Sequence, residues 1–179
     1  MKTYYLTLSQ TFPATHPRKG EPTYFKEKVM DAICVAHGID RRPKGIIDGL
    51  HGYKLHTIRA NYKLWSKRFK QIDAGEAVLS VRQWSGKPYR SKMIEICRLT
   101  KKDGIGIQKL YLTDEINLLG EYGIVESTWE LFGIPGDSKV SCKQLAYNDG
   151  LSYEDWDAWF EKYDQSKPLA IIHFTKFRY

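Results

Sequence analysis

The order of strand-like and helix-like patterns is the feature that most limits the fold of this chain. A strand-like segment at 4–9 is followed by two helix-like segments, 23–37 and 61–74, before the next strand-like segment begins at 77–84. In a doubly wound parallel sheet, strands and helices alternate one by one. The order argues against that class. It predicts an α+β fold with a mostly antiparallel sheet, for which a barrel is one arrangement.

Three helices are predicted from apolar spacing and capping residues, in addition to a short helix at 140–147. Phe25, Val29 and Ile33 recur every four residues, which places them on one face of the first helix. Asn61 is a favourable N-cap for the second helix, and Ser152 begins a capping box for the third. The third helix carries aromatic residues at helical spacing, which are Trp156, Trp159, Phe160 and Tyr163.

The remaining strands are predicted from β-branched and aromatic residues between turn signals. The segments 77–84 and 89–99 form a hairpin across a turn that holds Gly and Pro. Further strands are expected at 105–112 and 169–179. The stretch 113–136 stays ambiguous, because its helical spacing is interrupted by glycines.

Length and composition predict one domain over residues 1–179. A chain of 179 residues is long enough for one domain with a core and short for two. No apolar run approaches the roughly 20 residues of a membrane span, so we expect no membrane partner. The N-terminus lacks the apolar segment of a signal peptide, and the cytoplasm is therefore the expected compartment.

Positive charge is concentrated in the first part of the chain. Residues 1–102 hold 21 Lys and Arg against 8 Asp and Glu, a balance of +13, whereas residues 103–179 hold 7 against 13, a balance of −6. A basic half suggests an anionic partner, with nucleic acid as the leading candidate. A basic surface that is simply solvated is the alternative, because charge asymmetry alone fixes no ligand.

A polar cluster at 54–59 follows a Gly-rich connection at 38–52 that we predict to be a loop. A lysine whose pKa is lowered by burial can take a proton from a hydroxyl group, so Lys54 and Thr57 could form a nucleophile pair. In a regular strand these two side chains would point to opposite faces. The pair can serve one site only if the backbone is irregular near 52–56. The alternative is an edge strand with solvated basic side chains.

A second cluster lies on the predicted hairpin. Basic and aromatic side chains alternate there, as contacts to phosphates and stacking on bases require. Exposed lysines and cross-strand aromatic pairs also occur on hairpins for structural reasons alone. The candidate residues of this hairpin cluster are Arg82, Trp84, Lys87, Tyr89 and Arg90.

Other site chemistry finds little support in the sequence. The five histidines never fall at metal-ligand spacing, so no metal site is expected. Nucleophile-elbow, P-loop and dinucleotide-binding fingerprints are missing, so no cofactor is expected. Asp149 stands in an Asn-Asp-Gly sequence, which is common turn chemistry.

Three features in order resemble the ASCH domain, the activating-signal-cointegrator homology family. They are the motif K-x-x-T-x-R at Lys54, Thr57 and Arg59, the strand entry at 74–79, and an acid-Gly turn before an aromatic helix and a last strand. The resemblance covers about residues 50–179. It implies a PUA-like, mostly antiparallel β-barrel with flanking helices. Residues 1–49 would be an N-terminal extension with an opening strand and helix, and the stretch near 103–140 resembles an insertion.

The resemblance implies two kinds of function. PUA-like and ASCH domains are regarded as modules that bind RNA, other single-stranded nucleic acid or a nucleotide in a cleft beside the barrel. A small bacterial ASCH group hydrolyses the acetyl amide of acetylcytidine with a Lys, a Thr and a Glu. The Lys matches Lys54, the Thr matches Thr57, and the acid falls at Asp149. This chain departs from that group there, because Asp is one methylene shorter than Glu.

The leading hypothesis is therefore an ASCH-domain protein that binds nucleic acid, with single-stranded RNA favoured, or a nucleotide in a basic cleft. Lys54, Thr57 and Arg59 would form its floor, and the hairpin cluster would form its rim. The first alternative is an amidohydrolase that acts on an acylated nucleoside, with Lys54, Thr57 and Asp149 as catalytic residues. The second alternative is a module that binds another protein. The sequence indicates no oligomeric state.

Overall fold

The computed structural model describes residues 1–39, 52–117, 120–126, 137–164 and 166–179. Most of the predicted loop at 38–52, and part of the insertion-like stretch near 103–140, lie outside these residues. In chain order, the elements are β1 (Lys2–Leu8), α1 (Phe25–Ala36), β2 (His56–Arg59), α2 (Tyr62–Asp73), β3 (Ala77–Trp84), β4 (Met93–Leu99), a 3₁₀ turn (Lys101–Asp103), β5 (Gly106–Asn117), β6 (Gly120–Glu126), β7 (Asp137–Ser141), α4 (Cys142–Asn148), α5 (Tyr153–Phe160) and β8 (Leu169–His173).

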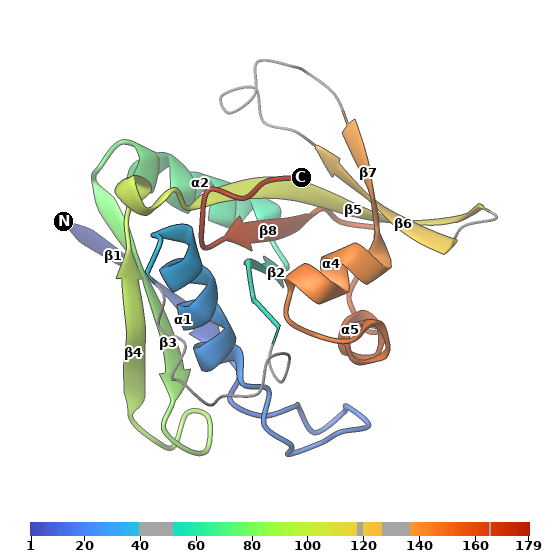
Figure 1. Ribbon diagram of the computed structural model, residues 1–179, viewed down its shortest axis with the longest axis horizontal. Helices are drawn as coiled ribbons and strands as arrows, with labels where there is room; N and C mark the ends of the chain where they lie inside the picture. The colour runs from blue at the N-terminus through green and yellow to red at the C-terminus, as the bar shows by residue number, and fades with distance from the viewer. Residues whose placement is uncertain (40–51, 118–119, 127–136, 165) are drawn as a thin grey trace.

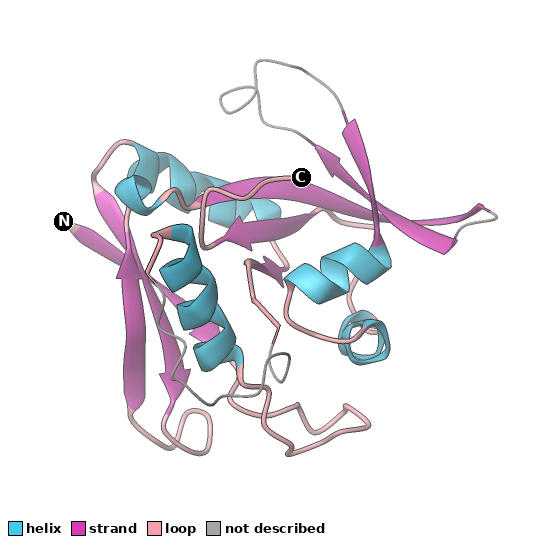
Figure 2. Cartoon of the chain, in the orientation of Figure 1, coloured by secondary structure: helices cyan, strands magenta, loops and turns pink. Residues whose placement is uncertain are grey.

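The strands form two sheets, and helices pack beside both (Figures 1 and 2). The smaller sheet has the order β1-β3-β4, in which β1 runs parallel to β3 and β4 runs antiparallel to it. The larger sheet has the order β2-β8-β5-β6-β7, and all of its pairings are antiparallel. The α+β class and the β3–β4 hairpin agree with the sequence-based prediction.

The predicted barrel is wrong. Among the described residues, no strand pairing joins the two sheets, which leaves β1, β4, β2 and β7 as open edges. The strand expected at 169–179 ends at His173. The chain then turns, and the backbone N–H of Tyr179 donates to the side-chain oxygen of Gln108 on β5 (3.0 Å).

One hydrophobic core serves both sheets. The buried cluster includes Leu6 and Leu8 from β1, Leu79 from β3, and Ile171 and Ile172 from β8. The helix α2 lies across the junction and contacts β3, β5 and β8. In Figure 1, α1 lies beside the smaller sheet, and α4 and α5 lie below the larger one. The two sheets are therefore held together by side-chain packing and not by a shared strand.

The two long helices begin differently. The side chain of Asn61 accepts a hydrogen bond from the backbone N–H of Leu64 (3.1 Å), as its predicted role as N-cap requires. At α1 the N-cap is Tyr24, which makes no capping bond. Thr23, with which the predicted helix 23–37 begins, instead precedes α1 and donates its hydroxyl proton to the carbonyl of Ser9 (2.7 Å). This bond ties the start of α1 to the end of β1.

In the part of the chain that the structure describes, no helix is both long enough and apolar enough to cross a bilayer.

Asn61 provides a test of how α2 is fixed next to β2. It has a positive φ of 63° and also caps the helix. Replacement by Ala removes the cap and strains the backbone, so Asn61→Ala should lower the free energy of unfolding by about 2 kcal/mol. Asn61→Gly removes the cap but tolerates the φ, and should cost less than about 1 kcal/mol. Urea unfolding measures both values, and equal losses would contradict the backbone argument.

Candidate functional site

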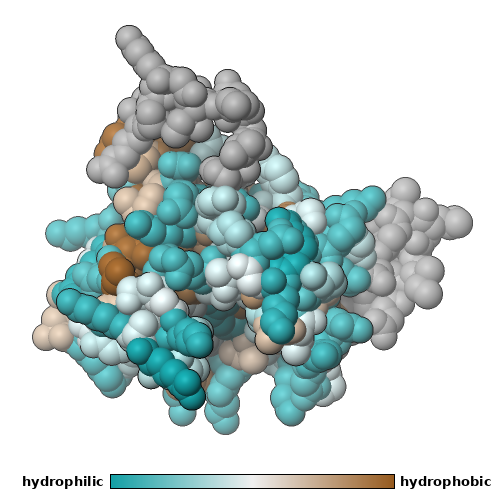
Figure 3. Space-filling view, turned by 90° about the horizontal axis from the view of Figure 1, so that it is seen from below, coloured by the Kyte–Doolittle hydropathy of each residue, from teal (hydrophilic) through white to brown (hydrophobic). Residues whose placement is uncertain are grey.

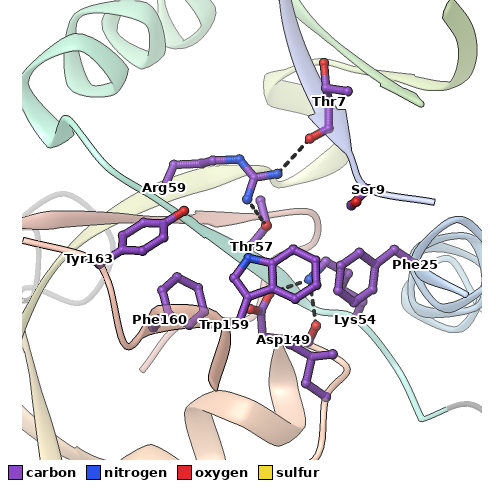
Figure 4. A pocket seen from close by; sticks show the side chains of 11 residues that line it. Thr7, Ser9, Phe25, Lys54, Thr57, Arg59, Asp149, Trp159, Phe160 and Tyr163 are labelled. Carbon is purple, nitrogen blue, oxygen red and sulfur yellow. Dashed lines mark hydrogen bonds and ion pairs between the residues drawn. The ribbon is translucent and has the colours of Figure 1, made fainter. Parts of the chain in front are cut away.

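A pocket of about 210 Å³ opens where the end of β1, the start of α1, β2 and α5 meet. It receives side chains from the beginning, the middle and the end of the chain (Figure 4). Its size is below the roughly 300–1,000 Å³ of sites for drug-sized ligands. The lining residues are Thr7, Ser9, Phe25, Lys54, Thr57, Arg59, Asp149, Leu151, Trp159, Phe160 and Tyr163.

Lys54 and Thr57 line this same pocket, although they are three positions apart and would face opposite sides of a regular strand. The strand β2 begins only at His56, so Lys54 lies in the irregular segment before it. The backbone N–H of Lys54 donates to the carbonyl of Lys28 on α1 (3.2 Å), and that of Leu55 donates to the carbonyl of Asn148 (2.8 Å). Through these bonds the segment pairs with α1 and the end of α4, and not with a neighbouring strand. This is the irregular backbone that allows both side chains to face one site.

Lys54 forms a buried ion pair with Asp149. Its ammonium group donates to the carboxylate Oδ1 and also to the backbone carbonyl of Asp149, the latter at 2.6 Å. The same nitrogen lies 3.9 Å from the centre of the Phe25 ring, within the range of a cation–π contact. The exposed fraction is 1% for Lys54 and 3% for Asp149, so water has little access to either charge.

Asp149 is placed by the turn that ends α4. It is the C-cap residue of that helix, and Gly150 follows with a positive φ of 76°. The ammonium group of Lys28 donates to the carbonyl of Gly150 (2.6 Å). A Cβ at Gly150 would lie 3.1 Å from the Lys28 side chain and 3.2 Å from Cβ of Lys54. The predicted Asn-Asp-Gly turn is therefore also the support of the acidic group in the pocket.

Thr57 and Arg59 share one side of β2. The Arg59 guanidinium donates to the Thr57 hydroxyl oxygen (2.8 Å) and to the Thr7 carbonyl on β1 (2.8 Å). The first bond occupies a lone pair of Thr57 and leaves its proton free to be donated. The second bond fixes β1 of the smaller sheet to β2 of the larger one, with the pocket beneath it (Figure 4).

Burial and charge shift the pKa values of the ion pair. Burial lowers the pKa of Lys54 to about 8, although the nearby Asp149 carboxylate opposes this shift. Burial also raises the pKa of Asp149, and the Lys54 ammonium opposes that shift. A lysine with a pKa near 8 is neutral in a measurable fraction of molecules at neutral pH, and a neutral amine can accept a proton.

Aromatic rings that were not predicted to belong to a site form the walls of the pocket. Figure 4 shows Phe25 on one side, Phe160 and Tyr163 on the other, and Trp159 in front. The centres of the Phe25 and Trp159 rings are 5.7 Å apart. In the sequence, the aromatic residues at 156–163 fall at the spacing of a single core-facing stripe, so they gave no separate signal of a site. Thr7 and Ser9 carried no such signal.

The loop before α1 holds α5 in place. His16, in the loop between β1 and α1, is buried, and its ring stacks on Phe12 with a centroid separation of 4.4 Å. Its Nε2 lies 3.0 Å from the carbonyl oxygen of Asp155, and Arg18 donates to the Asp155 carboxylate (2.7 Å). Trp159 packs against this loop through Phe12. These contacts fix the helix that supplies the aromatic wall.

The five residues of the hairpin cluster do not line the pocket. Arg82 lies over the Tyr5 ring (4.2 Å) and donates to the hydroxyl of Ser80 (2.8 Å). Trp84 and Tyr89 contact each other, with ring centres 5.3 Å apart. The predicted floor of the cleft is thus brought together with Asp149, whereas the side chains of the predicted rim are not part of the pocket lining.

His56 faces away from the pocket, on the other side of β2. Its ring packs on His173 and Tyr179, with centroid separations of 5.7 Å in both cases. Burial, with a smaller contribution from the Lys54 charge, lowers the pKa of His56 well below its usual value. His56 is therefore neutral and belongs to the packing behind the site.

Within the described residues, no group of three or more His, Cys, Asp or Glu side chains is arranged to hold a metal ion. Comparison with known proteins found no matching family model, curated protein or solved structure.

The pKa of Lys54 provides a direct test of the ion pair. We expect Lys54 to titrate near pH 8, and Asp149→Asn to lower this pKa further, because it removes the negative charge that favours the ammonium form. NMR of ¹³C-labelled lysine side chains measures the titration. Glu154→Gln removes an exposed carboxylate outside the pocket and should leave the pKa unchanged. An unaltered titration in Asp149→Asn would contradict the pairing.

The lowered pKa of Lys54 also makes the free energy of unfolding depend on pH. The folded-state pKa of about 8 lies below the ordinary value of 10.5, so between these pH values the folded protein binds fewer protons than the unfolded chain. The contribution of Lys54 to the free energy of unfolding therefore rises with pH from about 8 to about 10.5.

Proposed function

We propose that this chain is an ASCH-type protein whose pocket binds one base of a nucleotide, either free or within single-stranded nucleic acid. The proposal rests on one observation: four polar or charged side chains and four aromatic rings line the same small pocket. The polar and charged residues are Lys54, Thr57, Arg59 and Asp149. The order of motifs in the sequence supports the family assignment. The barrel implied by that resemblance forms no part of the proposal.

The size and walls of the pocket suit a single planar ring. A volume of about 210 Å³ accommodates one base and excludes two stacked bases with their sugars. Recognition of single strands relies on unstacked bases that lie against aromatic side chains. Phe25 stands on one side of the pocket and Phe160 and Tyr163 on the other, which offers stacking surfaces on both sides.

The polar groups suit the edge of a base. The hydroxyl of Thr57 can donate a proton, and the carboxylate of Asp149 can accept one. Lys54 and Arg59 add positive charge at the pocket, and residues 1–102 carry a surplus of basic side chains that would attract phosphates. A base has donors and acceptors along one edge, so this mixture of groups matches it better than it matches an aliphatic ligand.

Isothermal titration with cytidine and adenosine monophosphates, and with a single-stranded RNA of 12 nucleotides, tests the proposal. Trp159→Ala should weaken binding about tenfold or more, since a stacked base contributes about 1–3 kcal/mol. Trp159→Phe keeps an aromatic ring and should retain most of the affinity. Tyr147→Ala is the control, because Tyr147 is an exposed aromatic residue outside the pocket.

The proposal is rejected if neither mononucleotide binds, or if Trp159→Ala binds both as tightly as the wild type does.

A second candidate function is hydrolysis of an acyl amide on the base, and the lowered pKa of Lys54 favours it. Neutral Lys54 would take the proton of Thr57, whose oxygen would attack the acyl carbonyl. The amine leaves with a proton from the Lys54–Asp149 pair, and an acyl group stays on Thr57. Water then releases the acyl group as a carboxylic acid and restores the hydroxyl.

Acetylcytidine is the substrate with which to test hydrolysis. Turnover should fall about 100-fold or more in Lys54→Met and Thr57→Val, because each removes a group that takes part in proton transfer or attack. Thr57→Ser keeps the hydroxyl and should stay active. The rate should rise with pH around 8, as Lys54 becomes neutral. Absence of turnover by the wild type, or full activity of Thr57→Val, would exclude this reaction.

A further inference from the structure

The tip of the β3–β4 hairpin lies at the same end of the smaller sheet as the mouth of the pocket. β1 pairs in parallel with β3, with Thr7 opposite Arg82 and Leu8 opposite Gln83. Thr7 and Ser9 line the pocket, and β3 continues from Arg82 to its end at Trp84. The hairpin therefore leaves the sheet beside the pocket, although its side chains do not enter it.

The tip carries an aromatic pair. The rings of Trp84 and Tyr89 contact each other, and Tyr89 is 89% exposed. Tyr89 has a positive φ of 62°, a conformation that a tyrosine rarely adopts without support. Support comes from Ser91, whose hydroxyl accepts from the N–H of Gly86 (3.0 Å) and donates to the carbonyl of Lys87 (2.9 Å). The exposed ring is thus held on an ordered turn.

The tip also carries unpaired positive charge. Glu95 lies further along the hairpin, where its carboxylate pairs with Arg82 (3.4 Å) and Arg98 (3.1 Å). Lys87, Arg90 and Lys92 make no ion pair with any described residue. Seen from below, the end of the molecule that carries the tip shows mostly hydrophilic side chains with hydrophobic ones among them (Figure 3).

We infer that the hairpin tip is a second contact surface for single-stranded nucleic acid, which binds the nucleotides adjacent to the base in the pocket. Lys87 and Arg90 contact phosphates, and the Tyr89 ring stacks on a base. This inference rests on the proposed function, because the pocket takes the first base. It adds that the partner is a strand of several nucleotides and not a free nucleotide.

A nucleic acid fits this surface better than an acidic protein does. Both would be attracted by Lys87, Arg90 and Lys92, because charge alone does not distinguish them. An exposed aromatic ring beside the charges is what base stacking uses and what a polyacidic chain does not use. The hairpin leaves the sheet beside a pocket whose walls are aromatic, and this position favours the same partner at both places.

The test measures the affinity of the whole chain for cytidine monophosphate, a 12-nucleotide RNA and DNA of the same sequence, and poly-L-glutamate, at several salt concentrations. Lys87→Ala/Arg90→Ala should lower the affinity for the oligonucleotides about tenfold or more at low salt, and should reduce the slope of log affinity against log salt by about 1.4. Tyr89→Asn removes the ring, tolerates the positive φ, and should lower the affinity about fivefold.

Two controls distinguish the effect of the tip variants from a general loss of positive charge and from a loss of binding in the pocket. Lys63→Ala/Lys67→Ala removes two exposed lysines from α2 and should have a much smaller effect on the oligonucleotides. None of the tip variants should alter the affinity for cytidine monophosphate. Trp159→Ala should weaken the binding of both the mononucleotide and the oligonucleotides.

The outcomes distinguish the two proposals. Tip variants that bind the oligonucleotides as the wild type does, or oligonucleotides that do not bind, would overturn the inference. It would also be overturned if poly-L-glutamate bound as tightly and lost the same affinity in Tyr89→Asn. If the tip variants weaken oligonucleotide binding while Trp159→Ala has no effect, the tip contact stands and the proposed pocket function fails.

Discussion

The arrangement of the site depends on the buried ion pair between Lys54 and Asp149. The pair joins the segment before β2 to the turn after α4, two parts of the chain that are 95 positions apart. Removal of one partner from such a pair leaves a buried charge and typically costs about 3–5 kcal/mol. The pair is therefore a constraint on the fold as well as a source of chemistry. It brings a lysine with a lowered pKa, an acid and the Phe25 ring to one point, and Thr57 and Arg59 complete the polar side of the pocket.

Local signals predicted most elements of the fold, and non-local pairing explains what they missed. Asn61 caps α2 as its sequence position suggests, and the hairpin of β3 and β4 follows from adjacent strand patterns. The barrel did not follow from such signals, because closure depends on which distant strands become neighbours. The parallel pairing of β1 with β3 joins residues that are 75 positions apart in the chain, and after β8 ends at His173 the N–H of Tyr179 donates to the side chain of Gln108 on β5. No local pattern encodes these contacts.

The site was predictable to the extent that its residues are chemically distinctive. Lys54, Thr57 and Asp149 were singled out, and the structure places them in one pocket. The aromatic wall was not singled out, because Trp159 and Phe160 fit a core-facing stripe equally well in the sequence. The hairpin cluster was expected at the rim of the same cleft. Its composition was visible in the sequence, but whether its side chains enter the pocket depends on how the two sheets are arranged.

The bond from Arg59 to the carbonyl of Thr7 has a practical consequence for any attempt to isolate the site. The family resemblance suggests a core that begins near residue 50, and a shortened protein would naturally start there. Such a protein would lose Thr7, Ser9 and Phe25 from the pocket, and Lys28 from beneath the turn of Asp149. It would also expose the β3 edge that β1 now covers. The described residues 1–39 thus supply part of the pocket and of its support.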